Sequence, residues 1–145
     1  DAGLDLFATE DYEIGPGEIV KVKTGIQIES VGDNSVFHLV MDRSSMGSKG
    51  ILKLAGVIDI GYRGEILVIL TNVNTGSIFR KIANGEPLTH AMLDDYTYHI
   101  KKGDKIAQLV TVKIHNNDVS VNLLTDNYQW DNTSRGEAGF GSSGR

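Results

Sequence analysis

The sequence predicts a single all-β domain of the jelly-roll, sandwich or barrel type. Three observations support this fold class. Apolar and polar residues alternate with a period of two over most of the chain, whereas a helical period is rare. Glycine is frequent, with 17 residues against 2 prolines, which is typical of a chain with many turns. A length of 145 residues suits one domain of ordinary size.

The strands are expected in the order in which the apolar runs occur. The segment 20–28 alternates strictly after a Gly-Pro-Gly turn. The next run, 36–41, is apolar except for His38 and predicts a strand buried on both faces, and 66–70 is a solid apolar run typical of a central strand. Further strands are expected at 96–101, 106–114 and 119–124, one short helix within 44–54, and a helical turn within 88–95.

Composition excludes several classes of function. The formal net charge is −5, so the chain is a poor binder of polymeric nucleic acid, whose phosphates need compensating cations. The absence of cysteine excludes disulfides, thiol catalysis and Cys-zinc sites, and it suits a reducing cytoplasm, bacterial or that of a phage host. No apolar run has the ~20 residues of a membrane span. The first residue is Asp1 rather than Met, so we expect further residues upstream.

Five segments combine glycine with ionisable or hydroxyl residues. Asp5 in the first segment could hold a hard cation such as Mg²⁺, and Arg43, Ser44 and Ser45 in the second could hold phosphate oxygens. Each segment taken alone is also consistent with a structural role, namely an exposed aspartate, a helix N-cap, a β-hairpin with an Asx turn, a turn into a strand, or a disordered terminus. The segments are residues 1–8, 43–50, 56–66, 102–109 and 135–144.

Other groupings lack the spacing of known sites. The four histidines show no metal-ligand pattern, so we interpret them as structural or surface residues. Neither a Ser-His-Asp grouping nor a Walker-type phosphate loop is present in the sequence. The strand pattern by itself would also suit a capsid-like or lectin-like structural protein.

The order of the five segments along the chain distinguishes a functional interpretation from the structural roles described above. They contain Ala-Gly-x-Asp-Leu, Arg-Ser-Ser, Gly-Val-Ile-Asp-x-Gly-Tyr-Arg-Gly-Glu, Gly-Asp-Lys-Ile-Ala-Gln-Leu and Arg-Gly-x-x-Gly-Phe-Gly-Ser-Ser-Gly. This series resembles the five motifs of the trimeric dUTPases, from Asp1 to Gly144. The resemblance implies a homotrimer of jelly-roll-like subunits, each with a domain at 1–125 and a C-terminal arm at 126–145. It also implies hydrolysis of dUTP to dUMP and pyrophosphate, at sites that collect motifs from all three chains.

The resemblance assigns a role to each matching residue. Asp59 matches the general base that deprotonates the attacking water, and Asp5 matches the residue that helps to hold Mg²⁺ through water. Tyr62 matches the ring under the deoxyribose, and the hairpin with Gly56 and Ile58 matches the one whose backbone recognises uracil. The remaining matches bind the triphosphate or, for Phe140 in the arm, stack on uracil; they are Arg43, Ser44, Ser45, Gln108, Arg135, Phe140, Gly141, Ser142 and Ser143.

The segment 73–100 is longer than the corresponding connection in most of these enzymes. Some phage members carry an insertion there that is associated with binding a protein partner, so a repressor-like partner is one expectation. A surface hairpin without a partner is the other. A phage or bacterial source fits both.

The related dCTP deaminases also carry Arg-Ser-Ser, and they are the nearest alternative. Their catalytic glutamate would fall at Ile69, whose apolar side chain cannot transfer protons.

Overall fold

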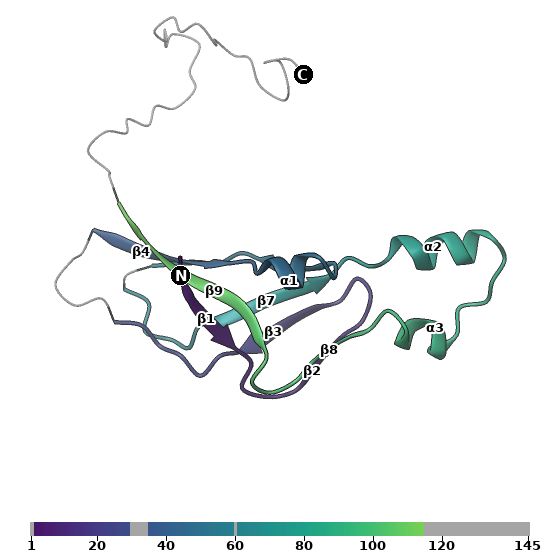
Figure 1. The fold of residues 1–145 in the computed structure, drawn as a ribbon, viewed down its shortest axis with the longest axis horizontal. Coiled ribbons are helices and arrows are strands. Elements are labelled where there is room, and N and C mark those ends of the chain that lie inside the picture. Colours follow the sequence, from purple (N-terminus) through teal and green to yellow (C-terminus); the bar gives the residue numbers. More distant parts are fainter. Residues whose placement is uncertain (1, 30–34, 60, 115–145) are drawn as a thin grey trace, which may run out of the picture. The chain divides into compact units, whose positions relative to one another are not determined.

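The described part of the chain contains three antiparallel sheets (Figure 1). The structure is a computed structural model that describes residues 2–29, 35–59 and 61–114. One sheet has four strands in the order β1-β9-β4-β6, one pairs β2 with β8, and one has the order β3-β7-β5. The strands are β1 Leu4–Phe7, β2 Tyr12–Ile14, β3 Ile19–Lys23, β4 Val36–Met41, β5 Ile51–Leu54, β6 Val57–Ile58, β7 Leu67–Asn72, β8 Tyr98–Ile100 and β9 Lys105–Lys113. The helices are α1 Ser44–Gly47, α2 Gly76–Ala83 and α3 His90–Asp94.

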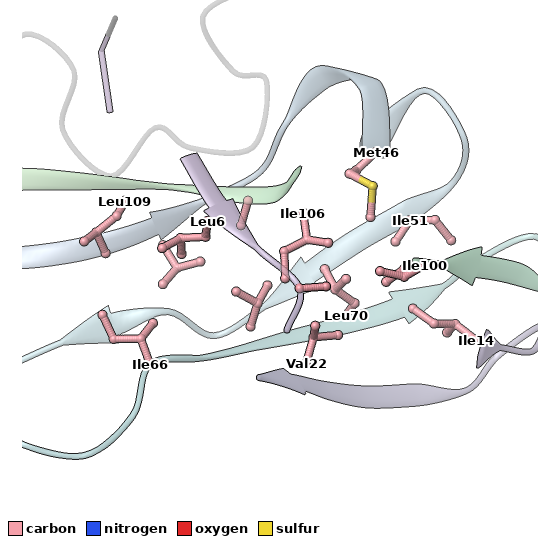
Figure 2. Packing of buried hydrophobic residues seen from close by; sticks show 14 residues of the cluster. Leu6, Ile14, Val22, Met46, Ile51, Ile66, Leu70, Ile100, Ile106 and Leu109 are labelled. Atoms are coloured by element: carbon pink, nitrogen blue, oxygen red, sulfur yellow. The ribbon is translucent and has the colours of Figure 1, made fainter. Parts of the chain in front are cut away.

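The buried apolar side chains form one cluster between the sheets. Several strands contribute residues at alternate positions because successive side chains point to opposite faces. In β7, for example, Val68 and Leu70 are almost fully buried while Leu67 is exposed. Met46 brings α1 into the same cluster (Figure 2). Burial of one such side chain contributes roughly 1.5–3 kcal/mol. The labelled members in Figure 2 are Leu6, Ile14, Val22, Met46, Ile51, Ile66, Leu70, Ile100, Ile106 and Leu109.

Most predicted strands are present, with corrections at their ends. The strand predicted at 36–41 is confirmed by β4, but its burial on both faces is not, because only His38 and Val40, which share one face, are buried. β7 is the central strand of its sheet as expected. The strand predicted over 20–28 ends at Lys23, and Gly25 follows with a φ of 68°, outside the extended region. The predicted strand 119–124 lies outside the described residues.

The predicted β-hairpin over 56–66 is wrong. The turn is present, since the Tyr62 amide donates to the Asp59 carbonyl at 3.0 Å. Its two arms belong to different sheets, however, because β6 pairs with β4 whereas β7 pairs with β3 and β5. Similarly, only Ser44–Gly47 of the predicted 44–54 helix is helical, and Ile51–Leu54 forms β5.

The segment 73–100 contains two helices and β8, so the surface hairpin expected there is also wrong. Thr89 begins α3, since its hydroxyl accepts a hydrogen bond from the Met92 amide at 3.2 Å. After α2, Gly85 has a φ of 82°, which closes the helix in the usual way. Both helices lie beyond the end of β7 (Figure 1).

The side chain of Asn72 connects the segment 73–100 to the sheets through hydrogen bonds. Its side chain is completely buried, and its Nδ2 donates to the carbonyls of Ile14 at 2.9 Å and Tyr96 at 2.7 Å. Its Oδ1 accepts from the Asn74 amide at 3.0 Å. Three otherwise separate stretches of backbone therefore share one amide side chain.

Replacing Asn72 with leucine is expected to lower the free energy of unfolding by about 2–4 kcal/mol. The change leaves two backbone carbonyls without their donor, and each orphaned buried group costs roughly 1–3 kcal/mol. Urea unfolding at fixed protein concentration measures this. The control is Thr71→Val on the same strand, where a change below about 0.5 kcal/mol is expected. Equal midpoints for Asn72→Leu and wild type would contradict the assigned role.

Candidate active site

The register of the four-stranded sheet brings three of the five segments together. Asp5 on β1 pairs with Gln108 on β9, and Gln108 pairs in turn with Met41 on β4. Arg43 follows β4 directly. Side chains that are about 100 residues apart in the sequence thus meet at one end of the sheet because β9 lies between β1 and β4.

Asp5 is held by two cations. Its Oδ2 lies 2.8 Å from Lys105 Nζ, and its Oδ1 lies 3.4 Å from Arg43 Nε. Arg43 Nη1 also donates to the Lys105 carbonyl at 2.9 Å, which fixes the guanidinium. The hydrogen bond from Lys105, aided by the charges of both cations, holds the pKa of the Asp5 carboxyl below its ordinary value against partial desolvation. Asp5 is therefore anionic at neutral pH.

A cavity of about 360 Å³ opens beside this cluster, and we call it the Asp5 pocket. Two cationic groups and two hydroxyls border it, which suits a polyanion such as a chain of phosphates. Gly3 allows the strands to approach closely here, since a Cβ at this position would lie 2.7 Å from the Leu109 carbonyl oxygen. The lining residues are Ala2, Gly3, Asp5, Arg43, Ser44, Ser45, Lys105 and Gln108.

The donor set of the Asp5 pocket fits one kind of metal ion. Among its described lining residues Asp5 is the only carboxylate, and the described ranges contain no group of three His, Asp or Glu side chains able to hold an ion. One carboxylate with water and phosphate oxygens is a common arrangement for Mg²⁺. The pocket therefore fits an ion that arrives with a polyphosphate rather than one held by the protein alone.

A second cavity of about 180 Å³, the Asp59 pocket, lies over the turn that follows β6. The Tyr62 hydroxyl donates to the Glu65 carbonyl at 2.9 Å, so the ring is fixed although 43% of the residue is exposed. The Asp59 side chain is exposed and has no hydrogen-bond partner within the described ranges. The lining residues are Val57, Ile58, Asp59, Tyr62, Glu65 and Leu67.

Gly56 positions this turn against the sheet. Its φ is 124°, and a Cβ would lie 2.9 Å from the Val40 carbonyl oxygen. Its own carbonyl accepts from the Val40 amide at 2.8 Å. A side chain at residue 56 would therefore push β6 away from β4.

The two pockets lie at opposite ends of β4. Because His38 pairs with Ile58, Asp59 falls beside Phe37, whereas Arg43 lies beyond the other end of the strand. Gln108 pairs with Met41, so Asp59 and Gln108 lie four residues apart along β4, which is roughly 13 Å. The two cavities share no lining residue among those described. Within one chain, Asp59 therefore does not line the cavity that contains Asp5.

The structure thus divides the predicted site residues into three sets. Asp5, Arg43, Ser44, Ser45 and Gln108 line the first cavity. Ile58, Asp59 and Tyr62 line the second, with Gly56 beside it. The predicted arm residues Arg135, Phe140, Gly141, Ser142 and Ser143 lie outside the described residues.

Lys105 is a site residue that the sequence reasoning missed. The segment 102–109 was expected to be no more than a turn into a strand apart from Gln108. The only feature of the sequence that could have indicated Lys105 is its position as a cationic residue at the start of the strand that carries Gln108.

His38 has the structural role expected of it. It is buried, and its Nδ1 lies 3.0 Å from Thr111 Oγ1. No helix among the described residues is long and apolar enough to cross a membrane.

Comparison with known proteins shows a similarity over almost the whole chain. The dUTPase family profile matches residues 1–85 and 92–144. A deoxyuridine 5′-triphosphate nucleotidohydrolase of Desulfitobacterium hafniense is 41% identical over 148 residues, covering 99% of this chain and 81% of that protein. The enzyme of the same name from Variola virus is 36% identical over 143 residues, covering 99% and 79%.

Solved structures agree with this similarity. The dUTPase of Staphylococcus bacteriophage 80alpha with dUPNHPP has a TM-score of 0.74 at 28% identity, covering all of this chain and 87% of that one. The D95N mutant dUTPase of phage phi11 of S. aureus, whose structure reveals the coordination of a structural Mg(II) ion, has a TM-score of 0.66 at 27% identity, covering 90% and 86%. The jelly-roll-like fold expected from the sequence is therefore confirmed.

Proposed function

Because the chain belongs to the dUTPase family, we propose that it hydrolyses dUTP to dUMP and pyrophosphate by attack of water on the α-phosphorus. One observation carries the proposal. Among the described residues, those expected to bind the triphosphate line one pocket with cationic and hydroxyl groups, and those expected to bind deoxyuridine line another with Tyr62 and Asp59. Neither pocket alone contains the groups needed for the whole nucleotide. A site formed by a pocket from each of two chains would hold the whole nucleotide.

The Asp5 pocket binds the triphosphate in this proposal. Arg43 supplies a fixed guanidinium, Ser44 and Ser45 supply hydroxyls, and Gln108 supplies an amide. Asp5 would hold a triphosphate-bound Mg²⁺ through water, and such an ion neutralises phosphate charge and aligns the chain for in-line attack. The local charge of this pocket explains how a protein of net charge −5 can bind a polyanion.

The Asp59 pocket binds the nucleoside and supplies the base. Asp59 accepts a proton from the attacking water, for which its free, exposed carboxylate is suited. The Tyr62 ring, fixed through its hydroxyl, lies under the deoxyribose and leaves no room for a 2′-hydroxyl. Backbone groups at Gly56 and Ile58 recognise uracil, so that cytosine fails on its hydrogen-bond pattern and thymine on its methyl group.

The assembly we propose is a homotrimer. A single chain leaves several large apolar side chains exposed, among them Leu4 at 71%, Val57 at 67% and Ile19 at 62%. Symmetric contact between copies would cover such residues.

Nucleotide turnover in the presence of Mg²⁺ tests the proposal. dUTP, dCTP, dTTP and UTP are supplied in parallel, and pyrophosphate and ammonia are measured. Release of pyrophosphate from dUTP alone supports the assignment. Release of ammonia from dCTP would refute it in favour of deamination, despite the apolar Ile69 on β7.

A second function is proposed for residues 73–100, namely binding of a repressor-like protein partner. This segment exposes Phe79 at 67% and Ile82 at 43% on α2, and Leu88 at 56% between the two helices; neighbouring exposed apolar side chains of this kind are typical of interaction surfaces. The family profile also omits residues 86–91, which connect α2 to α3 and include the start of α3. Hydrolysis and partner binding would then use separate parts of the chain.

Replacement of residues 76–94 by a short Gly-Ser linker is expected to leave kcat/KM for dUTP within about threefold. No residue of this range lines either pocket, and its buried side chains Ile78 and Met92 lie outside the main core cluster. Tyr96 is retained because its carbonyl accepts from Asn72. Steady-state kinetics with and without the replacement measure the effect, and a loss above tenfold would show that the helices belong to the catalytic scaffold.

A further inference from the structure

A third cavity of about 340 Å³ adjoins the Asp5 pocket, and we call it the Lys49 pocket. The two share Arg43, Ser45 and Lys105. The Lys49 pocket extends away from Asp5 and Gln108 toward Lys49 and Tyr98. These last two residues line the Lys49 pocket but not the Asp5 pocket. A molecule could therefore move from one cavity to the other without leaving Arg43 and Lys105.

Lys49 supplies the uncompensated charge of this pocket. Its Nζ lies 3.5 Å from the Tyr98 hydroxyl and 5.3 Å from the centroid of that ring. It forms no ion pair with an acidic side chain in the part of the chain that the structure describes. The one carboxylate that lines the cavity, Asp104, accepts a hydrogen bond from the Lys101 amide at 2.8 Å within its own turn.

The backbone that carries Lys49 is fixed from both sides. Its amide donates to the Met46 carbonyl at 3.0 Å, and its carbonyl accepts from Asn74 Nδ2 at 2.7 Å. Tyr98 is fixed as well, since its hydroxyl lies 3.4 Å from Met46 Sδ. The Lys49 backbone and the Tyr98 hydroxyl are thus held in place, and the exposed Lys49 side chain lies against the Tyr98 ring.

We infer that the Lys49 pocket binds inorganic pyrophosphate after it leaves the Asp5 pocket. The inference rests on the proposed function, which makes pyrophosphate the product. Three cations and two hydroxyls line this cavity with one carboxylate; Asp5 pairs with two of the cations from the neighbouring pocket, and Lys49 adds the charge that favours a small polyanion. Pyrophosphate held here remains in contact with Arg43 and Lys105, which the next triphosphate also needs, so it acts as a product inhibitor.

Isothermal calorimetry with inorganic pyrophosphate, without nucleotide, tests the inference on the full chain. Lys49→Met is expected to weaken pyrophosphate binding at least fivefold, and Lys49→Arg, which keeps the charge, to retain it within about twofold. The matched control Lys21→Met, on the exposed side of β3, is expected to bind as wild type does. Gln108→Ala, which alters the Asp5 pocket and not the Lys49 pocket, is expected to weaken pyrophosphate binding less than Lys49→Met does.

Kinetics on the same proteins separate the two cavities. Lys49→Met is expected to raise the inhibition constant for pyrophosphate at least fivefold with the KM for dUTP unchanged. Unchanged pyrophosphate binding in Lys49→Met would overturn the inference. A parallel rise in the KM for dUTP would also overturn it, because Lys49 would then belong to the substrate site. Absence of dUTP turnover in wild type would refute the proposed function, while calorimetry would still decide the pocket.

Discussion

Replacement of Asp59 by asparagine is expected to reduce kcat for dUTP by about 10²–10⁴-fold, with KM changed much less. A positioned general base contributes a factor of this size, and an amide cannot take a proton from water. Asparagine has nearly the same shape as aspartate, so contacts of the bound nucleotide remain. The side chain is exposed and has no hydrogen-bond partner within the described ranges, so folding should not change.

The measurement is steady-state hydrolysis of dUTP with Mg²⁺, followed by pyrophosphate release. Asp94→Asn is the control, because this aspartate lies exposed on α3 away from both pockets and should leave kcat unchanged. A variant Asp59→Asn that retains more than a tenth of wild-type kcat would show that another group activates the water. A rise in KM with constant kcat would show that Asp59 binds substrate instead.

Mixing two inactive variants is expected to restore about one quarter of wild-type activity. Asp59→Asn damages one pocket, and Gln108→Ala damages the other; the two residues lie roughly 13 Å apart along β4. If each site joins the Asp5 pocket of one chain to the Asp59 pocket of another, random trimers of both variants contain sites with two intact pockets. In an equimolar mixture the chance of that combination is about one in four.

The mixture must be formed by co-expression or by joint refolding, so that chains exchange. Each variant alone, carried through the same treatment, provides the baseline, and wild type mixed with Asp59→Asn provides the reference for partial damage. An activity no higher than the sum of the two separate variants would contradict a site shared between chains. It would then require that the chain bends enough to bring its own two pockets together.

The sequence was sufficient to predict the two strands with the clearest apolar patterns. Val36–Met41 is apolar except for His38, and Lys105–Lys113 is rich in β-branched and other apolar residues, so both were predicted closely. The hairpin at 56–66 was mistaken because alternation predicts a strand but not its partner, and pairing depends on residues far away in the chain. The helix Gly76–Ala83 was missed although Ile78, Phe79 and Ile82 have helical spacing.

The site was predicted in its residues but not in its geometry. Short patterns with glycine identified Asp5, Arg43, Asp59 and Gln108, since their order along the chain matches a known family. No pattern in one chain shows that Asp59 lies away from the other three, because that separation follows from the register of β6 on β4. Lys105 was missed because its function comes from contact with Asp5, a property of the fold rather than of its neighbours in the sequence.

Because the two pockets lie at opposite ends of β4, the length of this strand determines the distance between them. Its length sets the spacing at which each chain offers two half-sites to its neighbours. An insertion or deletion of one residue would shift that spacing by about 3.3 Å and turn every later side chain of β4 to the opposite face. The turns and the helices of 73–100 face no such requirement, so we expect length to vary there among related chains while β4 keeps a constant number of residues.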